Sequence, residues 1–111
     1  MRLELADKNP QAYKPDVAMT QQNLAILYWK LGMKEKAEEA YQEARNIRQE
    51  LASLNPQAYG IDYASTLVMG VVSLGKPTGE LEEAKAILLK YSEHPKAKRL
   101  LEIIDKRLKE H

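Results

Sequence analysis

The stretch RLELADKNPQAYKPDVAMT at residues 2–20 recurs 46 residues later as RQELASLNPQAYGIDYAST at residues 48–66. Of the 19 aligned residues 12 are identical, and they include the whole run from Asn9 to Tyr13, which recurs from Asn55 to Tyr59. A self-similarity with a period of about 20–50 residues is typical of repeat proteins, in which each unit buries its apolar face by stacking on its neighbours. We therefore expect a fold of stacked repeats.

Each unit contains two stretches with helical periodicity. In the first unit, apolar and small residues recur at steps of three and four, which places them on one face of a helix. Gly32 is expected to end the first helix, because glycine readily adopts the left-handed conformation found at helix ends. The buried stripe of the first helix is predicted to hold Val17, Ala18, Gln21, Leu24, Ala25, Tyr28 and Leu31. The buried stripe of the second helix is predicted to hold Ala37, Ala40, Tyr41, Ala44, Ile47, Leu51 and Leu54. Its outer side is predicted to hold Lys34, Glu35, Glu38, Glu39, Glu43, Arg45 and Arg48.

An asparagine followed by a proline marks the start of each unit. Asn9-Pro10 and Asn55-Pro56 predict an asparagine N-cap followed by proline at the first helical position, where its missing N–H costs nothing. His94-Pro95 begins a last helix with one polar side, which suits a cap on the end of a stack. The apolar residues of the second unit are Tyr63, Ala64, Leu67, Val71, Leu74, Leu81, Ala84, Leu88 and Tyr91, and those of the last helix are Ala97, Leu100, Leu101, Ile104 and Leu108.

These patterns predict one all-α domain over residues 1–111, built from antiparallel helix pairs. Residues 1–8 correspond to the end of a preceding repeat or to a short N-terminal cap. The first repeat is expected at 9–54, the second at 55–93 and the capping helix at 94–111.

The first unit keeps a recognisable order of large, small, aromatic, glycine and alanine positions. These positions are held by Asn23-Leu24-Ala25, Tyr28, Gly32, Ala37, Tyr41 and Ala44. In the order and spacing of these positions, the chain resembles the tetratricopeptide repeat (TPR) family, in its long-repeat, kinesin-light-chain-like variety. The second unit is degenerate, with Gly79, Ala84 and Leu88 retained and Met69-Gly70 near the large–small pair. The resemblance implies a right-handed superhelix of stacked helix pairs, whose first helices line a concave groove for an extended peptide or a partner helix. It also implies a non-catalytic scaffold for protein binding.

A second stripe runs along the first helix, about 100° ahead of the core stripe. It contains a tryptophan and a methionine, residue types that contribute strongly to many interfaces. Asn23 aligns with an asparagine that, in kinesin-light-chain-like members, hydrogen-bonds the peptide backbone, and Lys30 could bind an acidic side chain. The expected partner-binding residues are Met19, Gln22, Asn23, Ile26, Trp29, Lys30, Val68 and Val72.

An alternative role exists for the same residues, which could instead pack against the first helix of the next repeat. This alternative is favoured for Val68 and Val72. The groove also departs from the carboxylate-clamp TPR proteins, because Ile26 stands where the clamp has asparagine and Gln22 where it has lysine. We therefore do not expect that kind of binding.

Catalytic, nucleotide-binding and metal-binding chemistry is not indicated. The run from Gly70 to Thr78 has glycine and lysine at the spacing of a phosphate-binding loop, but Pro77 replaces a residue with an N–H and the run begins inside a helical pattern. With no cysteine and only His94 and His111 as histidines, no ligand set for a metal is evident. We expect no enzymatic activity and no cofactor.

The charge balance gives a further exclusion. Lysine and arginine number 17 against 16 aspartate and glutamate, so the net charge of +1 does not indicate a nucleic-acid or membrane partner. No signal peptide or membrane-spanning run is evident, and we expect a cytoplasmic protein. The expected partner is a protein or peptide. Self-association into a homo-oligomer is the alternative, because two units are close to the minimum for a stable stack.

Overall fold

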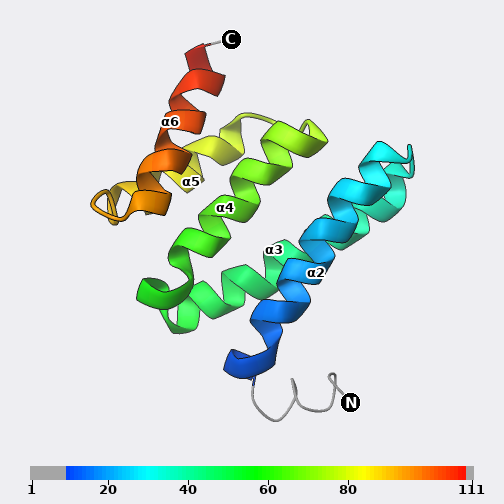
Figure 1. Ribbon diagram of the computed structural model, residues 1–111, viewed down its shortest axis with the longest axis horizontal. Coiled ribbons are helices and arrows are strands. Elements are labelled where there is room, and N and C mark those ends of the chain that lie inside the picture. Colours follow the sequence, from blue (N-terminus) through cyan, green and yellow to red (C-terminus); the bar gives the residue numbers. More distant parts are fainter. Residues whose placement is uncertain (1–9, 110–111) are drawn as a thin grey trace.

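The computed structural model describes residues 10–109 as five helices. Their bounds are Pro10–Lys30 (α2), Lys34–Leu54 (α3), Pro56–Leu74 (α4), Gly79–Leu89 (α5) and Pro95–Lys109 (α6). Each helix packs against the next along the chain, and α4 also contacts α2 and α6 (Figure 1). No strand occurs within these residues. The predicted all-α architecture of stacked helix pairs is confirmed.

The helices lie in two layers, with α2, α4 and α6 in one and α3 and α5 in the other (Figure 1). The described chain measures 45 × 36 × 19 Å. Because a helix with its side chains is about 10–12 Å across, the shortest dimension accommodates two helices. The described chain is therefore a slab two helices thick, in which α2, α4 and α6 share one face.

Local signals set the ends of the helices. After α2, Gly32 has a φ of +80°, and the N–H of Met33 donates to the carbonyl of Tyr28 at 2.8 Å, which closes the last turn. Asn55 caps α4, since its Oδ1 accepts from the backbone N–H of Ala58 at 3.3 Å, and Pro56 begins the helix. Both predictions are confirmed. The matching prediction for Asn9, and the one for residues 1–8, lie outside the described residues.

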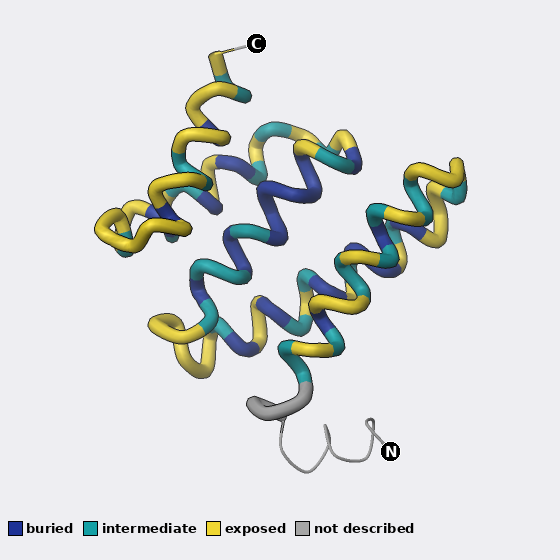
Figure 2. The backbone as a smooth tube through the Cα atoms, viewed as in Figure 1, coloured by how far each residue is buried: buried dark blue, intermediate teal, exposed yellow. Residues whose placement is uncertain are grey.

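Helix α4 is the central element, and it is buried along most of its length (Figure 2). It contributes to both apolar cores. The N-terminal core contains the buried residues Ala25, Ala37, Ala40, Tyr41, Met69 and Leu74. The C-terminal core contains Tyr63, Ala64, Leu67, Val68, Val71, Leu81, Ala84, Leu88, Ala97 and Ile104. One continuous stack therefore results from two cores that share α4.

Helices α3 and α4 pack tightly against each other at Gly70. A Cβ added at this glycine would lie 2.6 Å from the Oη of Tyr41, whose side chain is fully buried. The absence of a side chain at Gly70 therefore makes room for the Tyr41 ring between the two units.

Three predictions about burial are wrong. Leu31 and Leu54 were expected in buried stripes, but they are 64% and 62% exposed, because Leu31 follows the last residue of α2 and Leu54 is the last residue of α3. Arg48 was expected on the outer side of its helix, but it is only 6% exposed. Its guanidinium points toward α2 and α4, where it finds hydrogen-bond acceptors.

Candidate functional site

The predicted partner-binding residues of α2 divide into two rows. Met19, Asn23 and Lys30 are exposed, with Met19 at 52%. Their spacing of four and seven residues places them on one side of the helix. Within residues 10–109, neither Asn23 nor Lys30 forms a hydrogen bond or ion pair, and no helix covers this row. These three side chains are available to a partner.

Gln22 is instead part of a hydrogen-bonded cluster between the two units. The Nη1 atom of Arg48 lies 2.5 Å from the Oε1 of Gln22, 2.8 Å from the Oγ1 of Thr66 and 3.4 Å from the carbonyl oxygen of Asp62. Burial lowers the pKa of Arg48, an effect that the nearby charge of Asp62 opposes. A buried cation needs such acceptors, because charge-assisted hydrogen bonds offset part of its desolvation. Gln22 therefore helps to join α2, α3 and α4.

Ile26 and Trp29 are half-buried and pack against the N-terminal core. That core includes Met69 and Leu74 of α4, so these two side chains lie at the junction of the units. The Nζ of Lys34 also lies 5.4 Å from the centroid of the Trp29 ring, in cation–π range. The observed packing agrees with the alternative that the sequence allowed, although part of each side chain still reaches the surface.

The two valines of α4 lie in different surroundings. Val68 is 4% exposed and belongs to the C-terminal core, so the structure supports packing as its role. Val72 is 43% exposed. It lines a hollow between α4 and α6, together with Ile103, Lys106 and Arg107 of α6. These three residues of α6 were not predicted as a site. Ile103 carried a signal, because it is an apolar residue outside the core stripe of its helix.

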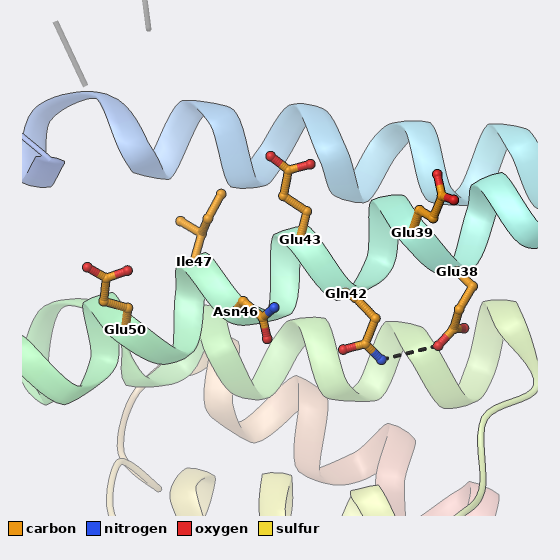
Figure 3. A pocket seen from close by; sticks show the side chains of 7 residues that line it. All are labelled: Glu38, Glu39, Gln42, Glu43, Asn46, Ile47 and Glu50. Atoms are coloured by element: carbon orange, nitrogen blue, oxygen red, sulfur yellow. Dashed lines mark hydrogen bonds between the residues drawn. The ribbon is translucent and has the colours of Figure 1, made fainter. Parts of the chain in front are cut away.

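A second hollow runs along α3 and has the opposite charge. All of its lining residues come from this one helix: Glu38, Glu39, Gln42, Glu43, Asn46, Ile47 and Glu50 (Figure 3). The Nε2 of Gln42 donates to the Oε1 of Glu38 at 3.1 Å, and Lys76 pairs with the same carboxylate. The bond from Lys76 is the main reason why the pKa of Glu38 is lowered, while burial acts in the other direction. The α3 surface is thus acidic, in contrast to the basic lining beside Val72.

Two tyrosines attach α5 to the preceding helices. The hydroxyl of Tyr41 donates to the Oε2 of Glu80 at 3.1 Å, and that of Tyr63 donates to the Oε2 of Glu83 at 2.5 Å. Burial, reinforced by these carboxylates, raises the pKa of Tyr41 well above its ordinary value and that of Tyr63 to about 12. Both hydroxyls stay protonated near neutral pH, so they act as hydrogen-bond donors that position α5.

The stretch that resembled a phosphate-binding loop does not have that geometry. Gly70 to Leu74 are the last residues of α4, and Gly75 ends the helix with a φ of 71°.

Within the described residues, no group of three or more His, Cys, Asp or Glu side chains is placed to hold a metal ion. None of the helices in the described part of the chain has the length and apolar character needed to cross a bilayer.

Part of the chain is similar to a known family. Residues 3–50 match the family model of the tetratricopeptide repeat. This segment is similar to a TPR. The match includes α2 and most of α3. The matched residues are somewhat less than half of the 111 residues. No curated protein sequence and no solved structure matches the chain. The helix pair α4–α5 lies outside the match, yet it stacks on the TPR-like pair in the same antiparallel manner.

Proposed function

We propose that this chain is a non-catalytic scaffold that binds a peptide or a partner protein on the face shared by α2, α4 and α6. TPR repeats generally mediate protein–protein interaction, and the first helix pair matches that family. The observation that carries the proposal is the uncovered row of Met19, Asn23 and Lys30 on α2. We assign the chain to the long-repeat, kinesin-light-chain-like variety as part of the same proposal.

The side chains of this row suit an extended segment. The flexible thioether of Met19 can adapt to apolar side chains of different shapes. The amide of Asn23 can both donate to and accept from a peptide backbone, and Lys30 can pair with a carboxylate. Ile26 and Trp29 support the row from the junction of the units and would add apolar contact through their accessible parts.

The test begins with peptides selected for binding to the full chain from a random library. Met19→Ala and Asn23→Ala are each expected to weaken binding about tenfold, the size of effect found at interface residues that make a central contact. Glu82→Ala on α5 is the matched control, because Glu82 is exposed in the other helix layer. Melting curves check that each variant is folded. Equal binding by all three variants would overturn the proposed site.

Self-association is the second candidate, and one observation favours it. Leu27 on α2 is 50% exposed, and Leu31, directly after this helix, is 64% exposed; Leu24 and Tyr28 line a hollow against α3. Burial of this surface against a second copy would remove large apolar side chains from water. Light scattering after size exclusion tests this. A dimer that the double variant Leu27→Ser/Leu31→Ser converts to a monomer is the expected result, and a monomer at every concentration would exclude it.

A further inference from the structure

The hollow between α4 and α6 combines apolar and cationic side chains in one place. Val72 and Ile103 are large aliphatic residues that remain 43% and 39% exposed. Lys106 and Arg107 complete the lining. These two aliphatic side chains come from different helices and are partly exposed to solvent. They can bury more apolar surface only against a ligand that enters the hollow.

The two cations have no acidic partner in the described part of the chain. Four ion pairs occur there, and those of α6 join Lys96 to Asp62 and Asp105 to Lys85. Glu102 lies one turn before Lys106 without forming an ion pair with it. The Nε of Arg107 is shielded from solvent and has no hydrogen-bond partner. Because Lys106 is exposed, Arg107 is half-buried and neither has an acidic partner in the described residues, both charges are open to pairing with an incoming carboxylate.

This lining selects among classes of ligand. A basic segment would be repelled by Lys106 and Arg107. A nucleic-acid backbone would pair with the cations but would leave Val72 and Ile103 without an apolar contact. A peptide segment with an acidic residue beside a large apolar residue uses both kinds of lining residue, because its carboxylate meets the cations while its apolar side chain covers the aliphatic pair.

We propose that the hollow formed by Val72, Ile103, Lys106 and Arg107 binds an acidic–apolar segment of a partner protein. The inference rests on the proposed function, because it names the chemistry of the ligand at one end of that binding face. Val72 lies 46 residues after Ile26, so it holds the position in α4 that Ile26 holds in α2. Lys30 on α2 is a further exposed cation without an ion pair in the described residues.

The experiment selects phage-displayed random peptides against the full chain and sequences the binders. Aspartate or glutamate beside leucine, isoleucine, phenylalanine or tryptophan is expected to be enriched. For a synthetic copy of a selected peptide, Lys106→Glu/Arg107→Glu is expected to weaken binding at least about tenfold. Val72→Ser is expected to weaken it several-fold. The matched control is Lys98→Glu/Lys109→Glu, which makes the same change of charge on α6 at exposed residues outside the hollow and is expected to change affinity less than about threefold.

Each other outcome decides the question. Binders without acidic enrichment, or an equal loss in both double variants, would overturn the inference. Peptides that lose binding on Met19→Ala and Asn23→Ala but tolerate Lys106→Glu/Arg107→Glu would leave the proposed function standing while the inference fails. A selection without binders would overturn both. A labelled single-stranded oligonucleotide is tested in parallel, and tighter binding than the peptide with the same dependence on Lys106 and Arg107 would replace the peptide by a nucleic acid.

Discussion

The helix pairs α2–α3 and α4–α5 begin with nearly the same sequence, yet equivalent residues differ in burial. Thr20 on α2 is exposed, whereas Thr66, 46 residues later on α4, is fully buried. Leu24 is half-buried at the surface, whereas its counterpart Gly70 faces the ring of Tyr41. The cause is the neighbour, because α3 packs on the side of α4 whose equivalent on α2 is uncovered in the described structure. A repeat in sequence therefore does not imply a repeat in energetics.

The largest difference between the pairs is expected at Leu67 and its counterpart Gln21. Leu67 is fully buried in the C-terminal core, so Leu67→Ala should lower the free energy of unfolding by about 3 kcal/mol. Gln21 is half-buried beside a surface hollow, so Gln21→Ala should change the free energy of unfolding by less than about 0.5 kcal/mol. Urea unfolding followed by circular dichroism measures both values. Similar losses at the two positions would contradict the difference in burial.

The next largest effect is expected at Gly70. Gly70→Ala places a Cβ within 2.7 Å of the Cε1 and Cζ atoms of Tyr41, so the ring must move within a packed core. A loss of about 2 kcal/mol in the free energy of unfolding is expected. Gly79→Ala is the control, because nothing lies within 4 Å of its added Cβ and its φ is not positive. If the two variants unfold at the same urea concentration, the close contact between α3 and α4 is not formed.

Thr66 and Thr20 offer a smaller but well-matched pair. Thr66→Val removes an acceptor from the buried Arg48 guanidinium and should cost about 1–2 kcal/mol of unfolding free energy. Thr20→Val changes an exposed residue and should alter stability by less than about 0.5 kcal/mol. Thermal melts at one pH compare the two. A loss at Thr20 as large as that at Thr66 would show that the Arg48 cluster is not what distinguishes the units.

The smallest effect concerns pH and the hydroxyl of Tyr63. The pKa of this tyrosine is raised to about 12 in the folded protein, against about 10 in an unfolded chain. Its stabilising contribution is therefore complete below pH 10 and is lost as the pH rises from 10 to 12. The difference in unfolding free energy between the parent and Tyr63→Phe should shrink over that interval. A constant difference would mean that burial and the bond to Glu83 do not raise the pKa of Tyr63 in the folded protein.

Much of the fold follows from local sequence. The stacked helix pairs, the end of α2 at Gly32, the start of α4 at Asn55 and the buried stripes around Ala25, Ala44 and Leu88 were all predicted, and the structure confirms them. These features depend on residues within a few positions of one another, such as Asn55 and the N–H of Ala58, so a single sequence contains the information.

The candidate site was predicted less completely. The row of Met19, Asn23 and Lys30 is exposed, while Gln22 is bonded to Arg48 and Val68 lies in the core. Periodicity assigns residues to a face of a helix, but it does not show which neighbour will cover that face. The hollow beside Val72 was missed for this reason, because it exists only where α6 returns to α4.

The sequence by itself determined that the chain consists of helices, where those helices end and that they come in stacked pairs, because hydrogen bonding along one helix and the spacing of its apolar residues are local properties. Only the tertiary structure decided that Arg48 is buried, that the ring of Tyr41 packs against Gly70 and that Val72 lines a hollow with two unpaired cations. These contacts join residues far apart in the chain, and their burial depends on how whole helices pack together.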